Sequence, residues 1–355
     1  MLVQSAGLVI IEGANEAASA TRLHTDGRPS HGHSVRSPIT LRHFALQELL
    51  GADVLTRTVA RLEHHGIQPV AVLAESENAN DSWPFVERKL VELSAKGVDS
   101  VVIVRLGSYA EIDFSDLLRF HENGGEVVTC VHDDQGPLQI CVFNLSARAE
   151  WLKMRRDLFR SFRQASSRYE FRGYVNRLES AADFRRLTVD ALNRRCQLQP
   201  IGTEVRPGVW LGQGARIHQR ARVVAPAYVG AQTRVRAGAL ITKTSSIERN
   251  SEVDSGTIVG DSNVLPGSYV GPGLEVAHAM VDGSRLLHLG RNLELELFDG
   301  RLLSPITGPA IQFPWLPLRR PRPAAVPQLA VPTDSAQPAS LYSTGYSAGE
   351  IAPSS

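Results

Sequence analysis

Residues 205–264 divide without insertion into blocks of six, VRPGVW-LGQGAR-IHQRAR-VVAPAY-VGAQTR-VRAGAL-ITKTSS-IERNSE-VDSGTI-VGDSNV. Each block, from Val205 to Val259, begins with an aliphatic residue. The fifth place of nearly every block holds a small residue, and Asn263 is the first polar exception. After Val259 the register shifts by one residue, and the aliphatic series continues at Val264, Val270 and Val276.

A period of six fits neither a single helix nor a single strand. On an α-helix six positions advance by about 240°, so these side chains would form no apolar stripe. One strand would keep them on one face, but strands of about sixty residues do not occur in soluble domains. The chain must therefore turn at each repeat, and the resulting coils stack so that their aliphatic residues bury one continuous core.

This repeat resembles the left-handed parallel β-helix family of hexapeptide-repeat proteins. Glycine follows the aliphatic residue in several repeats, as the pattern of that family asks, at Gly212, Gly230, Gly260 and Gly271. At three hexapeptides per coil, the series makes about four coils. We therefore expect a left-handed parallel β-helix over residues 200–300.

The part of the chain before the repeats alternates between expected strands and helices. Short apolar runs predict strands at Leu8–Ile11, Val70–Leu73, Val101–Val104 and Val127–Val131. Helical spacing between them predicts helices at 54–62, 83–95 and 114–121, followed by Gly66, Gly97 and Gly124. This alternation is typical of a mostly parallel sheet with helices on its faces. We expect it to form an α/β domain over residues 1–195.

Four stretches of this domain resemble the sugar-1-phosphate nucleotidyltransferases, which transfer a nucleotidyl group from a nucleoside triphosphate to a sugar phosphate. Residues 51–67 look like a helix of that family, and residues 101–121 look like its metal-site strand and the helix that follows. Residues 140–146 and 173–184 resemble a late strand and the closing element. The mannose-1-phosphate guanylyltransferases in this family join such a domain to a β-helix. The resemblance implies a Rossmann-like fold and a role in supplying GDP-mannose for surface polysaccharide.

The positions that carry catalysis in that family hold other residues in this chain. The glycine-rich loop is reduced to Gly13, the lysine position holds Phe44, and the metal aspartate position holds Gly107. These changes favour a non-catalytic binding, regulatory or scaffolding member, with no catalytic or metal-binding residue assigned. Gly13, Arg22 and Arg42 are the nominated nucleotide contacts. An active transferase with an atypical site is the alternative, and only that alternative requires Mg²⁺.

Acyl transfer is a further alternative, because many hexapeptide β-helices are acyltransferases that use histidine as a general base. The candidate residues are His218, His278 and His288. His218 follows the inward-facing Ile217 directly, so we expect its side chain to face outward.

Composition restricts the partners and the compartment. The chain has 355 residues with 38 basic and 37 acidic side chains, a formal net charge of +1, which indicates neither nucleic-acid nor membrane binding. Cys130, Cys141 and Cys196 lack metal-site spacing and are expected to be free thiols. With no expected signal or membrane-spanning segment, the sequence predicts a cytoplasmic protein. The expected partners are a second copy of the chain, a catalytic nucleotidyltransferase paralogue and a nucleotide sugar.

Three further expectations concern the linker and the C-terminal region. Residues 157–196 are arginine-rich and are interpreted as helices, the last of which packs the first domain against the first coil. Leu293–Leu297 alternates as a strand that covers the open end, with leucines inward and glutamates outward. Residues 304–355 are rich in Pro, Ala and Ser and are predicted to be a disordered tail.

Overall fold

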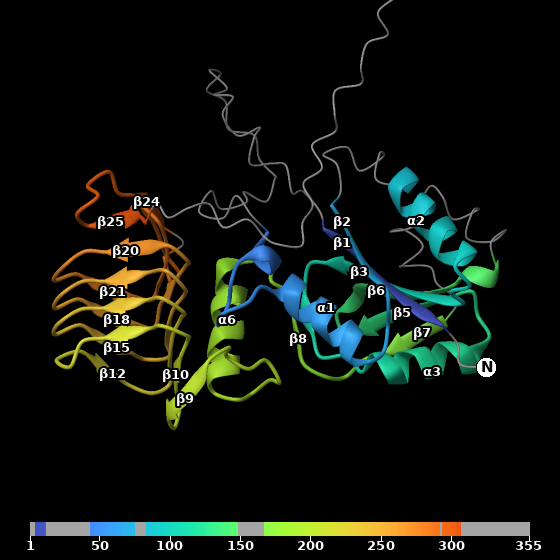
Figure 1. Ribbon diagram of the computed structural model, residues 1–355, viewed down its shortest axis with the longest axis horizontal. Helices are drawn as coiled ribbons and strands as arrows, with labels where there is room; N and C mark the ends of the chain where they lie inside the picture. Colours follow the sequence, from blue (N-terminus) through green and yellow to red (C-terminus); the bar gives the residue numbers. More distant parts are fainter. Residues whose placement is uncertain (1–3, 12–42, 75–82, 148–166, 292, 307–355) are drawn as a thin grey trace, which may run out of the picture. The chain divides into compact units, whose positions relative to one another are not determined.

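A computed structural model describes residues 4–11, 43–74, 83–147, 167–291 and 293–306 (Figure 1). The account below concerns the unit Met1–Pro309. Gly13, Arg22 and Arg42, nominated above as nucleotide contacts, lie outside the described residues, as does nearly all of the proline-rich segment.

The N-terminal part contains a six-stranded sheet of order β2-β1-β3-β6-β5-β7. All neighbouring strands are parallel except where β6 pairs antiparallel with β3 and β5. Its strands are β1 (Ser5–Ile11), β2 (Val70–Ala74), β3 (Ser100–Leu106), β5 (Val128–Asp133), β6 (Gly136–Asn144) and β7 (Ser167–Glu170). The expected mixed α/β fold with a mostly parallel sheet is confirmed for this part.

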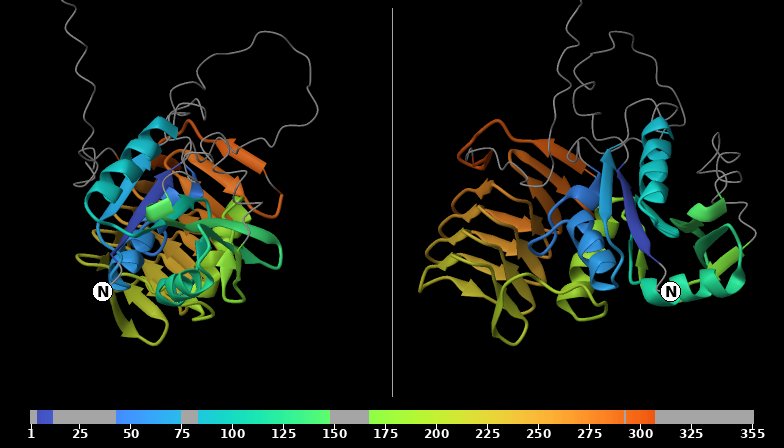
Figure 2. Two further views of the ribbon diagram at one scale, coloured as in Figure 1. Left: turned by 90° about the vertical axis from the view of Figure 1, so that its right-hand side faces the viewer. Right: turned by 45° about the vertical axis from the view of Figure 1, so that its right-hand side comes forward.

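Helices cover both faces of this sheet (Figure 2). Helices α1 (Val54–His64) and α3 (Phe114–Gly124) pack into the core on one face, and α2 (Trp83–Ala95) packs on the other. Short 3₁₀ turns lie at Phe44–Leu46 and Leu145–Ala147. Asp53 caps α1 through a 2.6 Å bond from the Thr56 amide, and Gly125 ends α3 in the left-handed conformation.

The region interpreted as helical between the domains contains strands as well. The structure places β7 at Ser167–Glu170 and β8 at Val175–Asn176, where β8 pairs with β4 (Tyr109–Ala110), and only then α6 (Ala181–Leu192). The purely helical interpretation is therefore wrong for residues 167–176. These strands could not be recognised from the sequence, because many of their side chains are polar and only partly buried, so they show no apolar alternation.

The C-terminal part is a stack of short, mostly parallel strands in three sheets (Figure 1). One sheet contains β9 (Thr203–Arg206), β10 (Val209–Leu211), β13 (Ala227–Val229), β16 (Ser245–Ile247), β19 (Asn263–Val264), β22 (Ala279–Asp282), β23 (Arg285–His288) and β24 (Leu293–Glu296). The second contains β11 (Arg216–Ile217), β14 (Arg234–Val235), β17 (Glu252–Val253), β20 (Ser268–Val270) and β25 (Leu303–Pro305). The third contains β12 (Arg222–Val223), β15 (Leu240–Thr242), β18 (Ile258–Gly260) and β21 (Glu275–Ala277).

Strand register follows the sequence repeat. Val209 pairs with Ala227 and Ala227 with Ser245, so successive coils are 18 residues apart. After the register shift at Val259 the offset becomes 17, as in the pairing of Ser246 with Asn263. The stacked parallel strands that the hexapeptide pattern predicts are present.

The aliphatic residues of the repeat fill the interior of the stack. Ile241, Ile247, Val253 and Val259 are fully buried in one cluster, and the earlier Leu211 and Ile217 pack against it while partly buried. Val205 is the exception, because it is 53% exposed on β9, which runs antiparallel to β10 and precedes the first complete coil. The expectation that the inward series begins at Val205 is wrong.

Small residues at the fifth place let hydroxyl groups bond across coils. Ser251 Oγ donates to the Leu265 carbonyl at 3.1 Å, and Thr233 Oγ1 donates to the Glu248 carbonyl at 2.9 Å. These bonds satisfy buried polar groups at the corners, where larger side chains would not fit.

The C-terminal end of the stack differs from the expectation. β24 pairs with β23 as an edge strand, but Leu293 and Leu295 are 45% and 43% exposed, so the expected inward orientation of the leucines is wrong. Among the described residues, no other strand pairs with the free edge of β24. The expected tail also begins too early, because Ser304 and Pro305 belong to β25 and pair with β20.

Helix α6 joins the sheet and the stack through a shared core. Phe184 and Leu187 lie in the same buried cluster as Tyr228, Leu265 and Met280 of the stack. Arg185, 5% exposed, donates 2.8 Å and 3.1 Å bonds to Asp261 Oδ1 and Asn263 Oδ1. The polar contacts of α6 are therefore with later coils, and not with the first coil as expected.

A buried carboxylate of the stack accepts two backbone amides of the α/β part. Glu248 accepts from Leu50 N at 2.9 Å and from Gly51 N at 3.1 Å. Both donors have positive φ, 54° and 95°. A Cβ at Gly51 would lie 2.6 Å from the Tyr228 hydroxyl, so this position requires glycine. Glu48 lies nearby, with Oε2 2.7 Å from Arg249 Nε in an ionic contact.

Two other expectations concern the cysteines and membrane-spanning helices. Cys130 and Cys141 are free thiols, as expected, although they are cross-strand neighbours on β5 and β6. Among the described residues, none of the helices has the length and apolar character needed to cross a bilayer.

Replacing Gly230 tests the close approach of coils. A Cβ at Gly230 would lie 2.6 Å from the Arg249 backbone nitrogen, whereas one at Gly260, at the same place of its repeat, would make an ordinary 3.6 Å contact. We expect Gly230→Ala to lower the free energy of unfolding by about 2 kcal/mol, and Gly260→Ala to change it by about 0.5 kcal/mol or less. Urea denaturation measures both, and equal losses would contradict the proposed coil contact.

The Glu248 carboxyl should make stability depend on pH. Burial, and then the nearby charge of Glu48, raises its pKa to about 8 despite the two amide bonds. Between pH 4.5 and about 8 the folded protein therefore keeps a proton that the unfolded chain has released. Because the folded state binds more protons, the free energy of unfolding falls as the pH rises through this range. We expect the stability difference between wild type and Glu248→Gln to fall by roughly 2 kcal/mol from pH 6 to pH 9. The exposed Glu122→Gln is the control, and a pH-independent difference for Glu248→Gln would refute the shift.

Candidate functional site

The sheet order identifies where a ligand is expected. β1 lies between β2 and β3 in the sheet. The connection from β1 therefore leads to the strand on one side of β1, and the connection from β2 passes back across β1 to the strand on its other side. Ligands of open parallel sheets bind outside the carboxyl ends of the strands near such a point. The segments that follow β1 and β2, residues 12–42 and 75–82, are outside the described residues. The described part of this edge is built from the ends of β3, β5 and β7.

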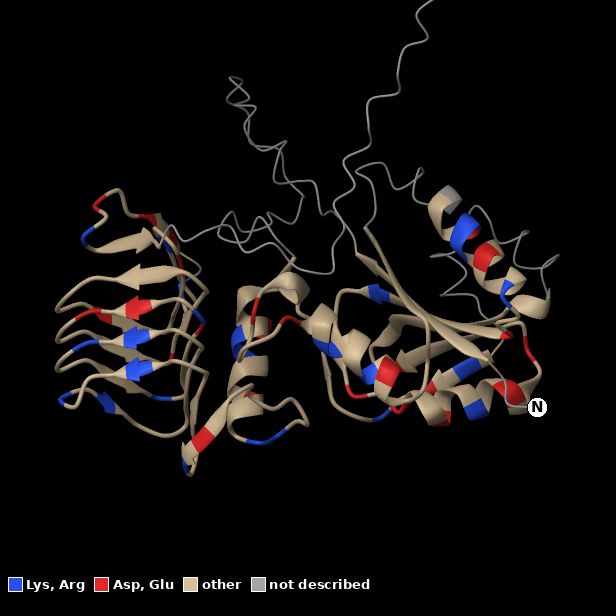
Figure 3. Cartoon of the chain, viewed as in Figure 1, with Lys and Arg blue, Asp and Glu red and all other residues tan. Residues whose placement is uncertain are grey.

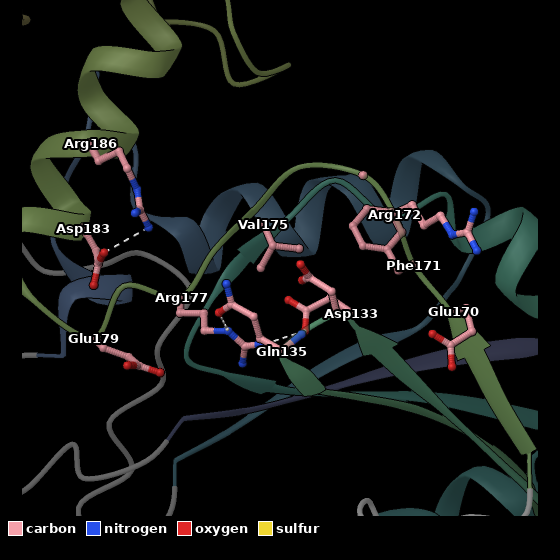
Figure 4. A pocket seen from close by; sticks show the side chains of 12 residues that line it. Asp133, Gln135, Glu170, Phe171, Arg172, Val175, Arg177, Glu179, Asp183 and Arg186 are labelled. Carbon is pink, nitrogen blue, oxygen red and sulfur yellow. Dashed lines mark hydrogen bonds and ion pairs between the residues drawn. The ribbon is translucent and has the colours of Figure 1, made fainter.

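A pocket of about 710 Å³ lies at the ends of β5 and β7 (Figure 4). Asp133 and Glu170 are the last residues of these two strands, and Asp134 and Gln135 form the turn into β6. The segment 171–177 and the start of α6 complete the lining.

Carboxylates outnumber guanidinium groups in this pocket. The acidic lining residues are Asp133, Asp134, Glu170, Glu179 and Asp183, and the basic ones are Arg172, Arg177 and Arg186. Two of the arginines are already paired, since Arg177 Nη2 lies 2.5 Å from Asp133 Oδ1 and Arg186 Nη2 lies 3.0 Å from Asp183 Oδ1. Among the described residues, no carboxylate lies within ion-pair distance of Arg172.

The N-terminus of α6 is capped by its own residues. Ser180 caps this helix by accepting from the Asp183 amide at 3.1 Å, and Asp183 Oδ2 accepts from Ser180 Oγ at 2.8 Å. The positive end of the helix is therefore compensated by its own residues, and a phosphate gains little there.

Phe171 and Gly173 shape one wall of the pocket. A Cβ at Gly173 would lie 2.4 Å from the Phe171 ring, so the ring rests against the glycine backbone. The sequence resemblance had marked Gly173 and Tyr174. Tyr174 instead donates to Asp190 Oδ2 of α6 at 2.8 Å and stabilises the connection to that helix.

Gly107, which occupies the position of the family's metal aspartate, lies directly after β3 at the carboxyl edge. A Cβ built at this residue would meet no atom within 4 Å, and its φ is not positive, so the backbone leaves room for a side chain. The absence of a carboxylate at this position is therefore not imposed by packing. In the part of the chain that the structure describes, no three His, Cys, Asp or Glu side chains are grouped so as to hold a metal ion.

The three histidines considered for acyl transfer have different surroundings. His218 is exposed, as expected, and its Nδ1 accepts from the Arg220 amide at 3.1 Å. His278 Nδ1 bonds to Asp261 Oδ2, whose other oxygen accepts from Arg185. Burial alone would raise the pKa of Asp261, but the bonds from His278 and Arg185 outweigh it and lower the pKa. The His288 ring lies 5.9 Å from the His278 ring.

Comparison with known proteins adds no family to this geometry. No protein-family model matches the sequence, and none of the curated proteins matches it either.

Sequence reasoning missed most of the pocket. Asp133 and Arg177 are 44 positions apart and meet only because β5 and the segment after β8 end at the same edge. The one signal that could have found Asp133 is its place two residues after the end of a predicted strand. Arg172, Glu179 and Asp183 lie in the region interpreted as helical, where no strand end was expected.

Removing Arg177 tests the charge arrangement of the pocket. The Asp133 side chain is only 8% exposed, so Arg177→Ala leaves a largely buried carboxylate without its cation. Because Arg177 is itself 25% exposed, we expect a loss of about 2 kcal/mol in the free energy of unfolding, less than for a fully buried pair. Arg172→Ala removes a pocket arginine that is not paired and should stay within about 0.5 kcal/mol of wild type. Urea denaturation at pH 7 distinguishes them, and equal stability of the two variants would show that the Asp133 pair contributes nothing.

Proposed function

We propose that this chain is a sugar-nucleotidyltransferase-like protein with a C-terminal left-handed parallel β-helix. In this proposal it is a non-catalytic binding, regulatory or scaffolding protein of nucleotide-sugar and surface polysaccharide metabolism, with a ligand of the GDP-mannose type. We further propose that it acts in the cytoplasm, associates with itself, and assists a catalytic nucleotidyltransferase paralogue.

The architecture supports the family part of the proposal. A mostly parallel sheet with its crossing point at β1 is followed by coils of 18 and then 17 residues, each contributing one strand to each of three sheets. This order, an α/β domain and then stacked coils, is the order that the sequence resemblance implies. The handedness of the coils and the membership of the family are parts of the proposal.

The proposal that the protein does not catalyse nucleotidyl transfer rests on the charge at the carboxyl edge of the sheet. Nucleotidyl transfer must neutralise the triphosphate and the leaving pyrophosphate, and enzymes do this with basic side chains and carboxylate-held magnesium. Here the strand end after β3 carries Gly107, with open space around it, and the pocket at the ends of β5 and β7 has five carboxylates against three arginines. Such an edge suits hydroxyl-rich ligands better than a reacting triphosphate.

The pocket supports a binding role. Its volume lies within the range of small-molecule sites, about 300 to 1,000 Å³. Carboxylates and arginine accept from and donate to sugar hydroxyls, and the Phe171 ring offers an apolar surface to one side of a sugar. Asp134, Glu170 and Arg172 form no hydrogen bond or ion pair with another side chain among the described residues, so they are available to a ligand.

Acyl transfer stays the second candidate because of His278. Its Nδ1 is held by Asp261, an arrangement that orients an imidazole so that Nε2 accepts a proton from an acceptor hydroxyl or amine. His278 is half exposed, which gives an acceptor access. Release of thiol from an acyl thioester, lost in His278→Ala, is the assay that would favour this candidate.

Calorimetric titration with GDP-mannose, GTP and acetyl-CoA, each with Mg²⁺, tests the proposal, with pyrophosphate release followed on the same protein. We expect GDP-mannose to bind without release of pyrophosphate, and Arg172→Ala to weaken that binding about tenfold through loss of a charge-assisted hydrogen bond. Arg186→Ala, whose guanidinium is already paired with Asp183, should weaken it less. Pyrophosphate release would establish an active transferase, and no binding of any nucleotide would refute the binding role.

A further inference from the structure

The three sides of the strand stack have different outer surfaces. The β10-β13-β16-β19-β22 side is covered, because Tyr228 and Met280 on its outer surface belong to the core shared with α6. The β11-β14-β17-β20 side is charged (Figure 3), with Arg234 and Arg236 contacting Glu252 at 3.7 Å and 2.7 Å. The third side, β12-β15-β18-β21, is the subject of the inference.

Two rows of outward residues run along this third side, which we call the open face. In strand register, Arg222 pairs with Leu240, Leu240 with Ile258, and Ile258 with Glu275. The residue that follows each of these along its strand faces inward. These residues, Val223, Ile241, Val259 and Val276, are buried in the core of the stack. The first outward row therefore reads basic, apolar, apolar, acidic.

The second outward row is small and mostly apolar. It consists of Val224, Thr242, Gly260 and Ala277, where Thr242 pairs with Gly260 and Gly260 with Ala277. Ile258 and Val224 are 38% and 41% exposed, so the open face presents branched aliphatic side chains to water. Isolated exposed aliphatic residues are common, but a flat group in register on one sheet indicates an interaction surface.

The first row ends in a positive charge on one side and a negative charge on the other. Among the described residues, neither the Arg222 nor the Glu275 side chain makes an ion pair or hydrogen bond with another side chain. They are three strand spacings apart, roughly 14 Å, with Leu240 and Ile258 between them. One end of the open face is therefore positive and the other negative.

We propose that the open face binds the open face of a second copy of this chain, about a two-fold axis that runs parallel to the strands. This rotation reverses the order of the coils, so Arg222 meets the partner's Glu275 and Glu275 meets the partner's Arg222. Leu240 packs on the partner's Ile258 at the centre, and Val224 packs opposite the partner's Ala277. Each contact occurs twice, as a closed two-fold interface requires.

The charge pattern decides between this arrangement and the other face-to-face two-fold. An axis parallel to the stack would keep each coil opposite the same coil of the partner, so the two copies of Arg222 would lie together at one end and the two copies of Glu275 at the other. Like charges in contact oppose association, whereas opposite charges at the rim favour it and fix the register. The structure therefore selects stacks that run in opposite directions.

The size of the open face sets the expected affinity. Four strands of two or three residues bury less surface than a standard interface, so association is expected to be weak, with a dissociation constant on the order of 10 µM. The inference does not depend on nucleotide binding, since none of these residues lines the pocket at the sheet edge.

Sedimentation equilibrium of the full chain tests the proposal through a charge reversal. We expect wild type to dimerise, and Arg222→Glu or Glu275→Arg to raise the dissociation constant about tenfold or more by placing like charges together. The double variant Arg222→Glu with Glu275→Arg restores opposite charges and should return to within about threefold of wild type. Ile258→Glu places a carboxylate at the apolar centre and should abolish the dimer.

Arg216→Glu is the matched control, because Arg216 is an exposed, outward arginine on the neighbouring charged side. It should leave the dissociation constant unchanged, and circular dichroism should confirm that every variant is folded. A monomeric wild type at 100 µM, which includes the case of a face that binds a different protein, would overturn the proposal. So would a dimer that the single charge reversals leave intact, or a double variant that stays monomeric.

Discussion

Helix α6 connects the described parts of the chain through a guanidinium group that is almost fully buried. Arg185 bonds to Asp261, to Asn263 and to the Lys243 carbonyl, and burial is the main cause that lowers its pKa. A buried charge is tolerated only where its hydrogen bonds are satisfied, so these partners fix the position of α6 on the coils. Because the other side of α6 packs into the sheet core, the same contact also places the sheet edge.

Several features depend on this placement. The N-terminus of α6 contributes Asp183 and Arg186 to the pocket at the ends of β5 and β7. The amides of Leu50 and Gly51 reach Glu248, and the outer surface of one side of the stack becomes core. Among the described residues, the other two sides of the stack lie outside this core, one charged and one mostly apolar between its two terminal charges.

The resemblance to sugar-1-phosphate nucleotidyltransferases and the chemistry of the sheet edge point in different directions. The element order agrees with the resemblance, while Gly107 and the acidic pocket lack the charges that phosphoryl transfer needs. The proposed function, a binding protein with this architecture and without the reaction, accommodates both observations. The nominated contacts Gly13, Arg22 and Arg42 lie outside the described residues and remain predictions.

The sequence by itself determined the local structure: the six-residue period, the inward aliphatic series from Leu211 onward, the limits of α2 and the start of α3. These are fixed by near neighbours, since alternation, glycine and capping residues act within a few positions. Only the tertiary structure decided that Asp133 meets Arg177, that Arg185 meets Asp261, and that Leu293 and Leu295 face water. Such contacts join residues far apart in the chain, and what covers a strand depends on which elements pack beside it. No local pattern records that information.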